Sequence, residues 1–135
     1  MKVLTKLVMA ISILALASCS AQRQLTSRLT GEWEIEKYEV RRADGGSTTL
    51  ENAGNIQFRG NGRGTQTFTS AIAQMDAVTT GDFRWSNDAQ TVYITGERAA
   101  HRKAWIIVES KRNSQHWRST DSEGNLQIMH LRKKY

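Results

Sequence analysis

Apolar and polar residues alternate with a period of two along most of this chain from residue 31 onward, and this alternation is the strongest constraint on its fold. In the first such stretch, Trp33 and Ile35 fall on one face and three glutamates fall on the other. Successive side chains of a strand point to opposite sides, so the pattern is typical of a strand with one buried and one wet face. A helix would instead place apolar residues three or four positions apart. The alternation therefore favours an all-β fold.

The same pattern predicts eight strands separated by turn-forming sequences such as Asp44-Gly45-Gly46-Ser47 and the Asn-Gly hairpin within residues 59–64. The strands are expected at residues 32–40, 55–58, 65–69, 81–86, 90–95, 103–109, 115–119 and 126–132. The chain has no proline, which central strands exclude. Eight antiparallel strands form either a sandwich or a closed sheet, and closure removes every edge strand. We expect an eight-stranded antiparallel up-and-down barrel.

Three segments depart from simple alternation. The apolar phase changes between Ile35 and Tyr38, which predicts a bulge or a strong bend near Lys37. Residues 70–80 break the pattern and fit either a helical turn or a long loop across an opening. Residues 103–109 are apolar on both faces, which predicts a strand covered on both sides.

The N-terminus has the layout of a secretory signal peptide. Lys2 and Lys6 precede an apolar run at residues 7–16, and small residues follow. The run is too short to cross a bilayer, which takes roughly 20 residues. The only cysteine follows at once, and Leu16-Ala17-Ser18-Cys19 resembles the lipobox of bacterial lipoproteins. The alternative is an ordinary secretion signal with an incidental cysteine.

The lipobox resemblance implies cleavage before Cys19, a diacylglycerol thioether on its sulfur and acylation of the new amino group. We therefore expect a signal peptide at residues 1–18, a lipidated tether at 19–28 and the barrel domain at 29–135. Several acyl chains would hold the protein on a membrane without a spanning helix. By resemblance to enterobacterial sorting, Ser20 indicates an outer-membrane location, and we favour its periplasmic face. No thiol then remains for a disulfide, a metal or a nucleophile.

Removal of Lys2 and Lys6 with the leader lowers the formal charge from +6 to +4. The remaining basic residues are spread along the chain, which fits solvated turns and strand edges. The alternative is attraction to anionic lipid headgroups beneath the anchor. Nucleic-acid binding is not expected, because no recognisable reading motif is present.

A family resemblance accompanies these patterns. Leu29-Thr30-Gly31-Glu32-Trp33 is similar to the lipocalin Gly-x-Trp signature, and the ordered strands over residues 29–133 resemble the short lipocalin-like lipoproteins of Bacteroidota. The resemblance implies structural roles for Gly31 and Trp33, with Trp33 at the closed end of the barrel and Arg132 of the last strand covering it. The chain is shorter than full lipocalins and lacks their C-terminal helix and Thr-Asp-Tyr segment.

Catalytic and metal sites are not expected, and no cofactor is implied. The glutamates fall on wet faces, and His101, His116 and His130 lack close ligand spacing. His116 and His130 lie on predicted neighbouring strands and could meet. The glycines at 60, 62 and 64 open a strand, so they fit a hairpin and not a phosphate loop at a helix N-terminus. We expect a protein that is not an enzyme.

The aromatic residues offer the candidate ligand site. Phe83, Trp85, Trp105 and Trp117 are the predicted wall of an apolar cavity, with Arg118 as a contact for a ligand carboxylate. The alternative is that these rings only fill the core. We expect a membrane-anchored lipocalin-like lipoprotein of the cell envelope that binds or carries a small hydrophobic or amphipathic molecule. The other hypothesis is a protein-interaction module, such as a hydrolase inhibitor or a structural partner of an envelope complex, with a filled barrel.

Overall fold

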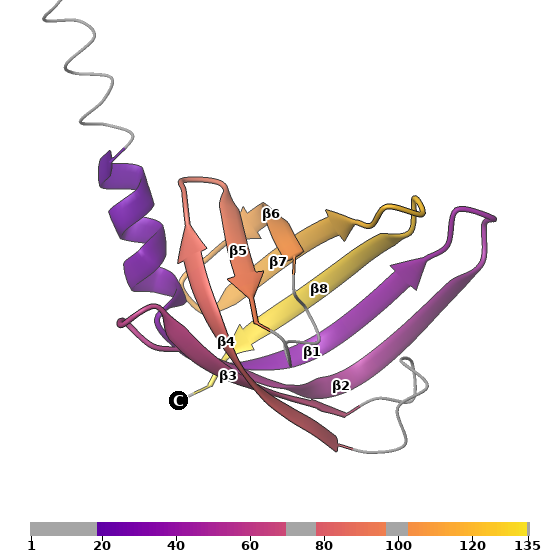
Figure 1. The fold of residues 1–135 in the computed structure, drawn as a ribbon, viewed down its shortest axis with the longest axis horizontal. Helices are drawn as coiled ribbons and strands as arrows, with labels where there is room; N and C mark the ends of the chain where they lie inside the picture. The colour runs from indigo at the N-terminus through magenta and orange to yellow at the C-terminus, as the bar shows by residue number, and fades with distance from the viewer. Residues whose placement is uncertain (1–18, 70–77, 97–102, 135) are drawn as a thin grey trace, which may run out of the picture.

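The computed structural model describes residues 19–69, 78–96 and 103–134. Eight strands form one antiparallel sheet, in which each strand pairs with its neighbours in sequence and β8 pairs with β1 (Figure 1). The strands are β1 Gly31–Arg41, β2 Ser47–Phe58, β3 Arg63–Thr69, β4 Val78–Asn87, β5 Thr91–Thr95, β6 Lys103–Ser110, β7 Ser114–Thr120 and β8 Leu126–Lys133. The predicted eight-stranded up-and-down barrel is therefore confirmed, and the sandwich is excluded.

β2 and β4 begin three or more residues earlier than the alternation predicts. β2 starts at Ser47 instead of residue 55, because backbone pairing with β1 extends over a polar segment that buries little. β4 starts at Val78, inside the segment predicted as a helical turn or a loop. Residues 70–77 of that segment lie outside the described part of the chain.

The bulge predicted near Lys37 is confirmed. The register of β1 shifts between Ile35 and Lys37 against both of its neighbours, β2 and β8. The shift reverses which residues face inward, so Ile35 and Tyr38 are both buried despite their opposite parity. A bulge of this kind also increases the local bend that a small closed barrel needs.

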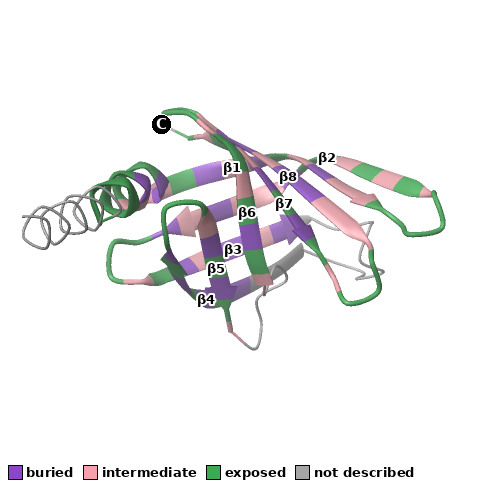
Figure 2. Ribbon diagram, turned by 90° about the horizontal axis from the view of Figure 1, so that it is seen from above, coloured by how far each residue is buried: buried purple, intermediate pink, exposed green. Residues whose placement is uncertain are grey.

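The prediction that residues 103–109 are covered on both sides is wrong. Trp105 is fully buried, but Ile106 and Val108 are 47% and 51% exposed. A barrel formed by one sheet has only one interior, and nothing in the described structure packs over this part of the outer wall. Buried and exposed residues alternate in the same way along much of the sheet, for example in β5 and β7 (Figure 2).

The interior is filled mainly by large side chains. The buried core contains Leu25, Leu29, Trp33, Ile35, Tyr38, Ala53, Ile56, Phe58, Phe68, Phe83, Trp85, Val92, Ile94, Trp105, Trp117, Met129 and Leu131. Rings meet at their edges, as aromatic pairs prefer. The segment from Ser20 to the C-terminus thus holds every core residue in the described part of the chain, so we expect it to fold without residues 1–19.

A helix over residues 19–29 covers one end of the barrel, here called the helix end (Figure 1). Leu25 is 6% exposed and Leu29 is fully buried, so the helix packs into the core. Gln22 and Thr26 bind Asn87 at the β4–β5 turn, with the Thr26 hydroxyl donating to Asn87 Oδ1 over 2.7 Å. The segment predicted as a tether, residues 19–28, is thus helical, and its Leu25 side chain packs with the folded domain.

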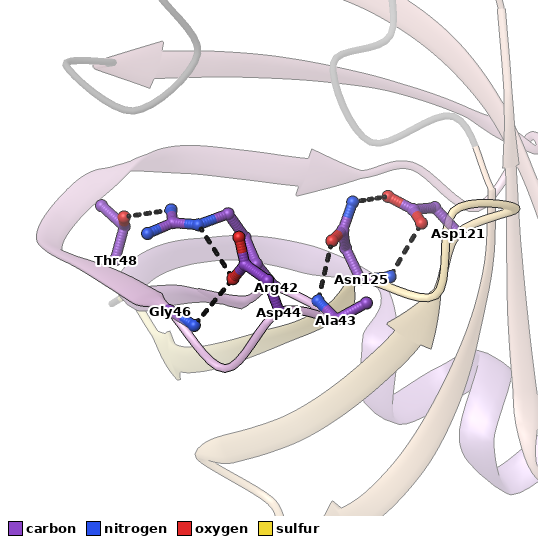
Figure 3. Close-up of polar contacts among 7 residues, drawn as sticks. All are labelled: Arg42, Ala43, Asp44, Gly46, Thr48, Asp121 and Asn125. Atoms are coloured by element: carbon purple, nitrogen blue, oxygen red, sulfur yellow. Dashed lines mark hydrogen bonds and ion pairs between the residues drawn. The ribbon is translucent and has the colours of Figure 1, made fainter.

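At the opposite end, two hairpins are tied together (Figure 3). The backbone N–H of Ala43 donates to Asn125 Oδ1 over 3.2 Å, which joins the β1–β2 turn to the β7–β8 turn. The Asp121 carboxylate accepts hydrogen bonds from the backbone N–H and from the side-chain amide of Asn125. The bond from the backbone N–H is the largest cause of the lowered pKa of the Asp121 carboxyl. The polar groups of this end largely bind one another.

Candidate functional site

The four aromatic residues predicted for the cavity wall all face the interior. Phe83, Trp85, Trp105 and Trp117 are at most 6% exposed. Phe58 from β2 lies at their centre, with ring centroids 5.6, 5.1 and 5.8 Å from Phe83, Trp85 and Trp117. The structure therefore brings these residues together, and in this half of the barrel their rings pack against one another. Whether they also contact a ligand stays a prediction.

The tryptophan N–H groups hold these rings in place. Trp85 Nε1 donates to the Arg59 carbonyl over 2.9 Å, and Trp117 Nε1 donates to Gln115 Oε1 over 3.2 Å. A buried indole N–H usually finds such a partner. The N–H donors of Trp85 and Trp117 are therefore already bound within the protein.

Arg118, predicted as a contact for a ligand carboxylate beside the aromatic wall, does not face the interior. Trp117 and Ser119 on β7 are buried, so Arg118 between them points outward and is exposed. Neighbouring residues on a strand cannot both face the same side. Trp117 and Arg118 therefore cannot both contact a ligand on the same side of β7.

Lys103 supplies a cation on the inner side that the sequence reasoning missed. Its ammonium lies 5.2 Å from the centre of the Trp105 ring, and burial lowers the pKa of this lysine, opposed by the Asp121 carboxylate. Lys103 shares its parity with Trp105 at the start of β6, so the alternation could have identified it. Tyr38 lies 6.4 Å from the same tryptophan, and burial raises its pKa to about 12.

Gln66 is the most unusual polar group in the interior. It lies on β3 between Ile56 of β2 and Gly81 of β4, and it is 1% exposed. Neither its amide nitrogen nor its amide oxygen has a hydrogen-bond partner. Such an orphaned amide costs about 1–3 kcal/mol, and buried polar groups in native proteins are rarely left unpaired. The shared parity of Gln66 and Phe68 was the signal that could have placed it inside.

Trp33 lies at the helix end and is fully buried. Its Nε1 donates to the carbonyl of Leu29 in the last turn of the helix over 2.9 Å. The cation over its ring is Lys133, whose ammonium lies 4.6 Å from the ring centre. Arg132 was predicted for this position, and that prediction is wrong by one residue. Arg132 is 58% exposed and binds Glu34 at 2.7 Å on the outer face.

Lys133 also closes the end of the helix. Its ammonium donates to the carbonyls of Thr30 and Arg28 over 2.8 and 3.3 Å, where the helix dipole favours a positive charge. Gly31 makes this approach possible, because a Cβ at that position would lie 2.6 Å from the Lys133 ammonium. Gly31, Trp33 and Lys133 thus form one structural unit, the helix clamp.

We expect Lys133→Met to destabilise the barrel by about 2 kcal/mol, because it removes charged hydrogen bonds and a cation–π contact. Arg132→Met should cost less than about 1 kcal/mol, since its ion pairs with Glu34 and Glu36 are exposed. Urea denaturation followed by circular dichroism compares the two. Equal losses for both variants would show that Lys133 has no special role in the clamp.

His116 and His130 meet on the outer wall, as their predicted strands allowed. Their rings are stacked, with centroids 4.1 Å apart and an angle of 22° between planes. Cross-strand partners on either side are Glu109 of β6 and Lys37 of β1. Within the described residues, no group of three or more His, Cys, Asp or Glu side chains is arranged to hold a metal.

The pKa of His130 is lowered, first by burial and then by the charges of His116 and Lys37. The folded protein therefore binds fewer protons at this site than the unfolded chain. Stability should fall as the pH drops below about 6.5, until the lower folded pKa is reached. His130→Gln should weaken this dependence, which urea midpoints measured between about pH 5 and 7 would reveal. A variant that keeps the full wild-type slope would contradict the assignment to His130.

Cys19 is exposed, with a free thiol, at the first described position of the helix. The predicted signal peptide at residues 1–18 lies outside the described residues. In the part of the chain that the structure covers, no helix has both the length and the apolar character needed to cross a membrane.

Comparisons with known proteins agree with the barrel. The chain is similar to a redesigned β-barrel, with a TM-score of 0.50 and 16% identity over 82% of this chain and 95% of that chain. It also matches a de novo designed fluorescence-activating β-barrel, with a TM-score of 0.38 and 16% identity over 81% and 96% of the two chains. No family model matches the chain, and no curated protein matches it. The likeness to the redesigned barrel shows the fold alone.

Proposed function

We propose that this protein is a lipid-anchored barrel of the cell envelope that binds a small amphipathic molecule with an anionic head and performs no catalysis. The observation that carries this proposal is the unpaired amide of Gln66, both polar atoms of which lack a hydrogen-bond partner in a mainly apolar interior. The lipocalin-like order of the strands supports the same role by resemblance.

Gln66 is suited to recognition because its amide offers both a donor and an acceptor. A ligand with a hydroxyl, amide or carboxyl group would form hydrogen bonds with this amide. Binding would thus remove the cost of leaving the amide unpaired in the ligand-free protein. The surrounding rings, including Phe68 from the same strand, would cover the apolar part of the molecule. Lys103 would then serve an anionic head, because its ammonium already lies over Trp105 within the wall.

Native mass spectrometry of the segment from Ser20 to Tyr135, offered palmitate and phosphatidylglycerol, tests this proposal. We expect a one-to-one complex with at least one of them. Gln66→Leu should weaken it at least tenfold while stabilising the empty barrel by about 1–3 kcal/mol, because the orphaned amide is gone. Arg118→Leu on the outer wall is the matched control and should bind normally. Absence of any complex, or unchanged binding by Gln66→Leu, would exclude the proposed site.

Anchoring through Cys19 is a separate part of the proposal. Its support is the lipobox resemblance and the exposed position of the thiol at the start of the helix. Radioactive palmitate fed to cells that produce the full chain should label the wild type and leave Cys19→Ser unlabelled. Equal labelling of both would place the acyl chain elsewhere, and no labelling would exclude the anchor.

A second candidate function is supported by the outer wall. Tyr93, Ile106 and Val108 are 41%, 47% and 51% exposed on the adjacent strands β5 and β6. Exposed apolar side chains gathered in one region often mark a protein interface. Capture of one envelope protein by the wild type, lost in Ile106→Lys and kept in Arg84→Lys, would favour an interaction module over ligand carriage.

A further inference from the structure

We propose that the helix end of the barrel is a docking face for an anionic phospholipid bilayer. The inference deepens the proposed anchoring at Cys19 and rests on it for the direction from which the bilayer approaches. The charges themselves are independent of acylation and of any ligand in the barrel.

Basic residues from the helix and from several turns and strand ends gather at the helix end. This set, here called the basic end, is Arg23, Arg28, Arg59, Arg63, Lys111, Arg112, Lys133 and Lys134. The described carboxylates at the same end are Glu32, Asp88 and Glu109, and Asp82 lines one pocket together with Arg59 and Arg63. In sequence these cations are scattered, and the up-and-down order of the strands gathers them, because every second turn lies at the same end.

Part of this charge is used within the protein, and part is not. Lys111 binds Glu109 at 2.7 Å, and Lys134 binds Glu32 at 3.4 Å. In contrast, no hydrogen bond or ion pair within the described residues occupies the exposed side chains of Arg23, Arg59 and Arg112. These three cations on separate elements are free to contact an external anion.

A groove at this end could hold one lipid headgroup. It has a volume of about 460 Å³ and lies between the helix, the β6–β7 turn and the end of β8. Its lining residues are Gln24, Ser27, Arg28, Arg112, Asn113 and Lys133. Cations and neutral donors are present without a carboxylate, which is the lining that a phosphate favours. Burial also lowers the pKa of Lys133, and a bound anion would oppose that effect.

The helix sets the orientation toward the bilayer. From residue 29 back to residue 19 it spans about 15 Å, so an acyl chain on Cys19 would hold this end of the barrel near the surface. The opposite end is more evenly charged: Arg41 binds Glu39, and Arg42 contacts Asp44 (Figure 3). The barrel therefore has an electrostatic polarity that matches the position of the proposed anchor.

A bilayer fits the basic end better than a protein partner does. Specific protein interfaces have an apolar or aromatic centre depleted in charge. The large exposed apolar side chains of the described structure, Tyr93, Ile106 and Val108, lie instead on the β5–β6 wall. A broad cationic face without such a centre suits the fluid negative surface of anionic lipids.

Vesicle flotation with the segment from Ser20 to Tyr135, which lacks Cys19, tests the proposal. Vesicles contain phosphatidylcholine alone or with one third phosphatidylglycerol, at low and high salt. We expect binding only to the anionic vesicles, weakened by salt. Arg23→Gln/Arg59→Gln/Arg112→Gln should lower the partition coefficient about 100-fold, because each near-surface cation contributes about fivefold. The control Arg41→Gln/Arg42→Gln/Arg118→Gln has the same net charge and should stay within about threefold of the wild type.

Two outcomes would overturn the docking face. One is the absence of binding to anionic vesicles by a segment whose circular dichroism shows the β-fold. The other is an equal loss in both triple variants, which would make the effect one of net charge alone. Since the segment lacks Cys19, failure of acylation in cells would leave the vesicle result standing. A failure of docking would likewise leave acylation untouched.

Discussion

Replacing Trp33 with alanine is expected to destabilise the barrel by about 3–5 kcal/mol, the range for removing a large buried aromatic side chain. Trp33 is fully buried, and three interactions depend on it. Its ring packs in the core, its N–H binds the Leu29 carbonyl, and its face carries the Lys133 ammonium. Alanine would leave a cavity and remove both of these contacts, which weakens the attachment of the helix to the barrel. Urea denaturation followed by far-ultraviolet circular dichroism measures the loss.

Trp33→Phe separates packing from the polar contacts. It keeps an aromatic face for Lys133 but loses the N–H bond to Leu29, so we expect a smaller loss of about 1–2 kcal/mol. Proteolysis by trypsin at Arg28 should become faster in Trp33→Ala than in Trp33→Phe, because the helix is released. An alanine variant that is no less stable than the phenylalanine variant would show that packing at the helix end does not depend on this ring.

The number and order of the strands could be predicted because this fold imposes a simple pattern of apolar and polar residues on the sequence. A single closed sheet has one interior and one exterior, so each strand must alternate. Even the bulge was readable, since the parity of Ile35 and Tyr38 cannot otherwise be reconciled. At these positions the polarity of each residue matches the side of the barrel wall on which it lies.

The first half of β2 could not be predicted in the same way. Ser47 to Asn52 is mostly exposed and has a single apolar residue, Leu50, so its burial signal is weak. Its strand conformation comes from backbone hydrogen bonds to β1, a tertiary effect that propensity does not capture. The apolar run in β6 had the opposite effect, because it predicted burial on both faces where one face is exposed. Residues that are hydrophobic on both faces fit a covered strand as well as a strand with an exposed apolar wall.

The candidate site was predicted in part. The aromatic lining followed from parity, but Arg118 was chosen for its charge and its nearness to Trp117 in sequence. Adjacent strand residues face opposite sides, so parity would have chosen Lys103 instead. The family resemblance directed attention to Arg132, whereas the ammonium of Lys133 reaches over the end of the barrel. Gln66 lacked any motif, and only its burial without a partner marks it.

Gly54→Ala is the other substitution for which we expect a large loss, about 3–5 kcal/mol from backbone strain and overpacking together. Gly54 has φ of +139°, a conformation that side chains rarely adopt. A Cβ there would overlap the backbone carbonyl oxygen of Thr67 on β3, which cannot move without breaking the sheet. The glycine lies where β2 pairs with Ile35, at the edge of the β1 bulge.

Gly45→Ala is the matched control, because it isolates the conformational cost. Gly45 has φ of +98° in the β1–β2 turn, but a Cβ there would meet nothing within 4 Å. We expect a loss of about 1 kcal/mol for this variant. Gly60→Ala, which has neither a positive φ nor a neighbour, should be close to neutral. If Gly54→Ala unfolds at the same urea concentration as Gly45→Ala, β2 and β3 are not packed at the bulge as closely as the structure requires.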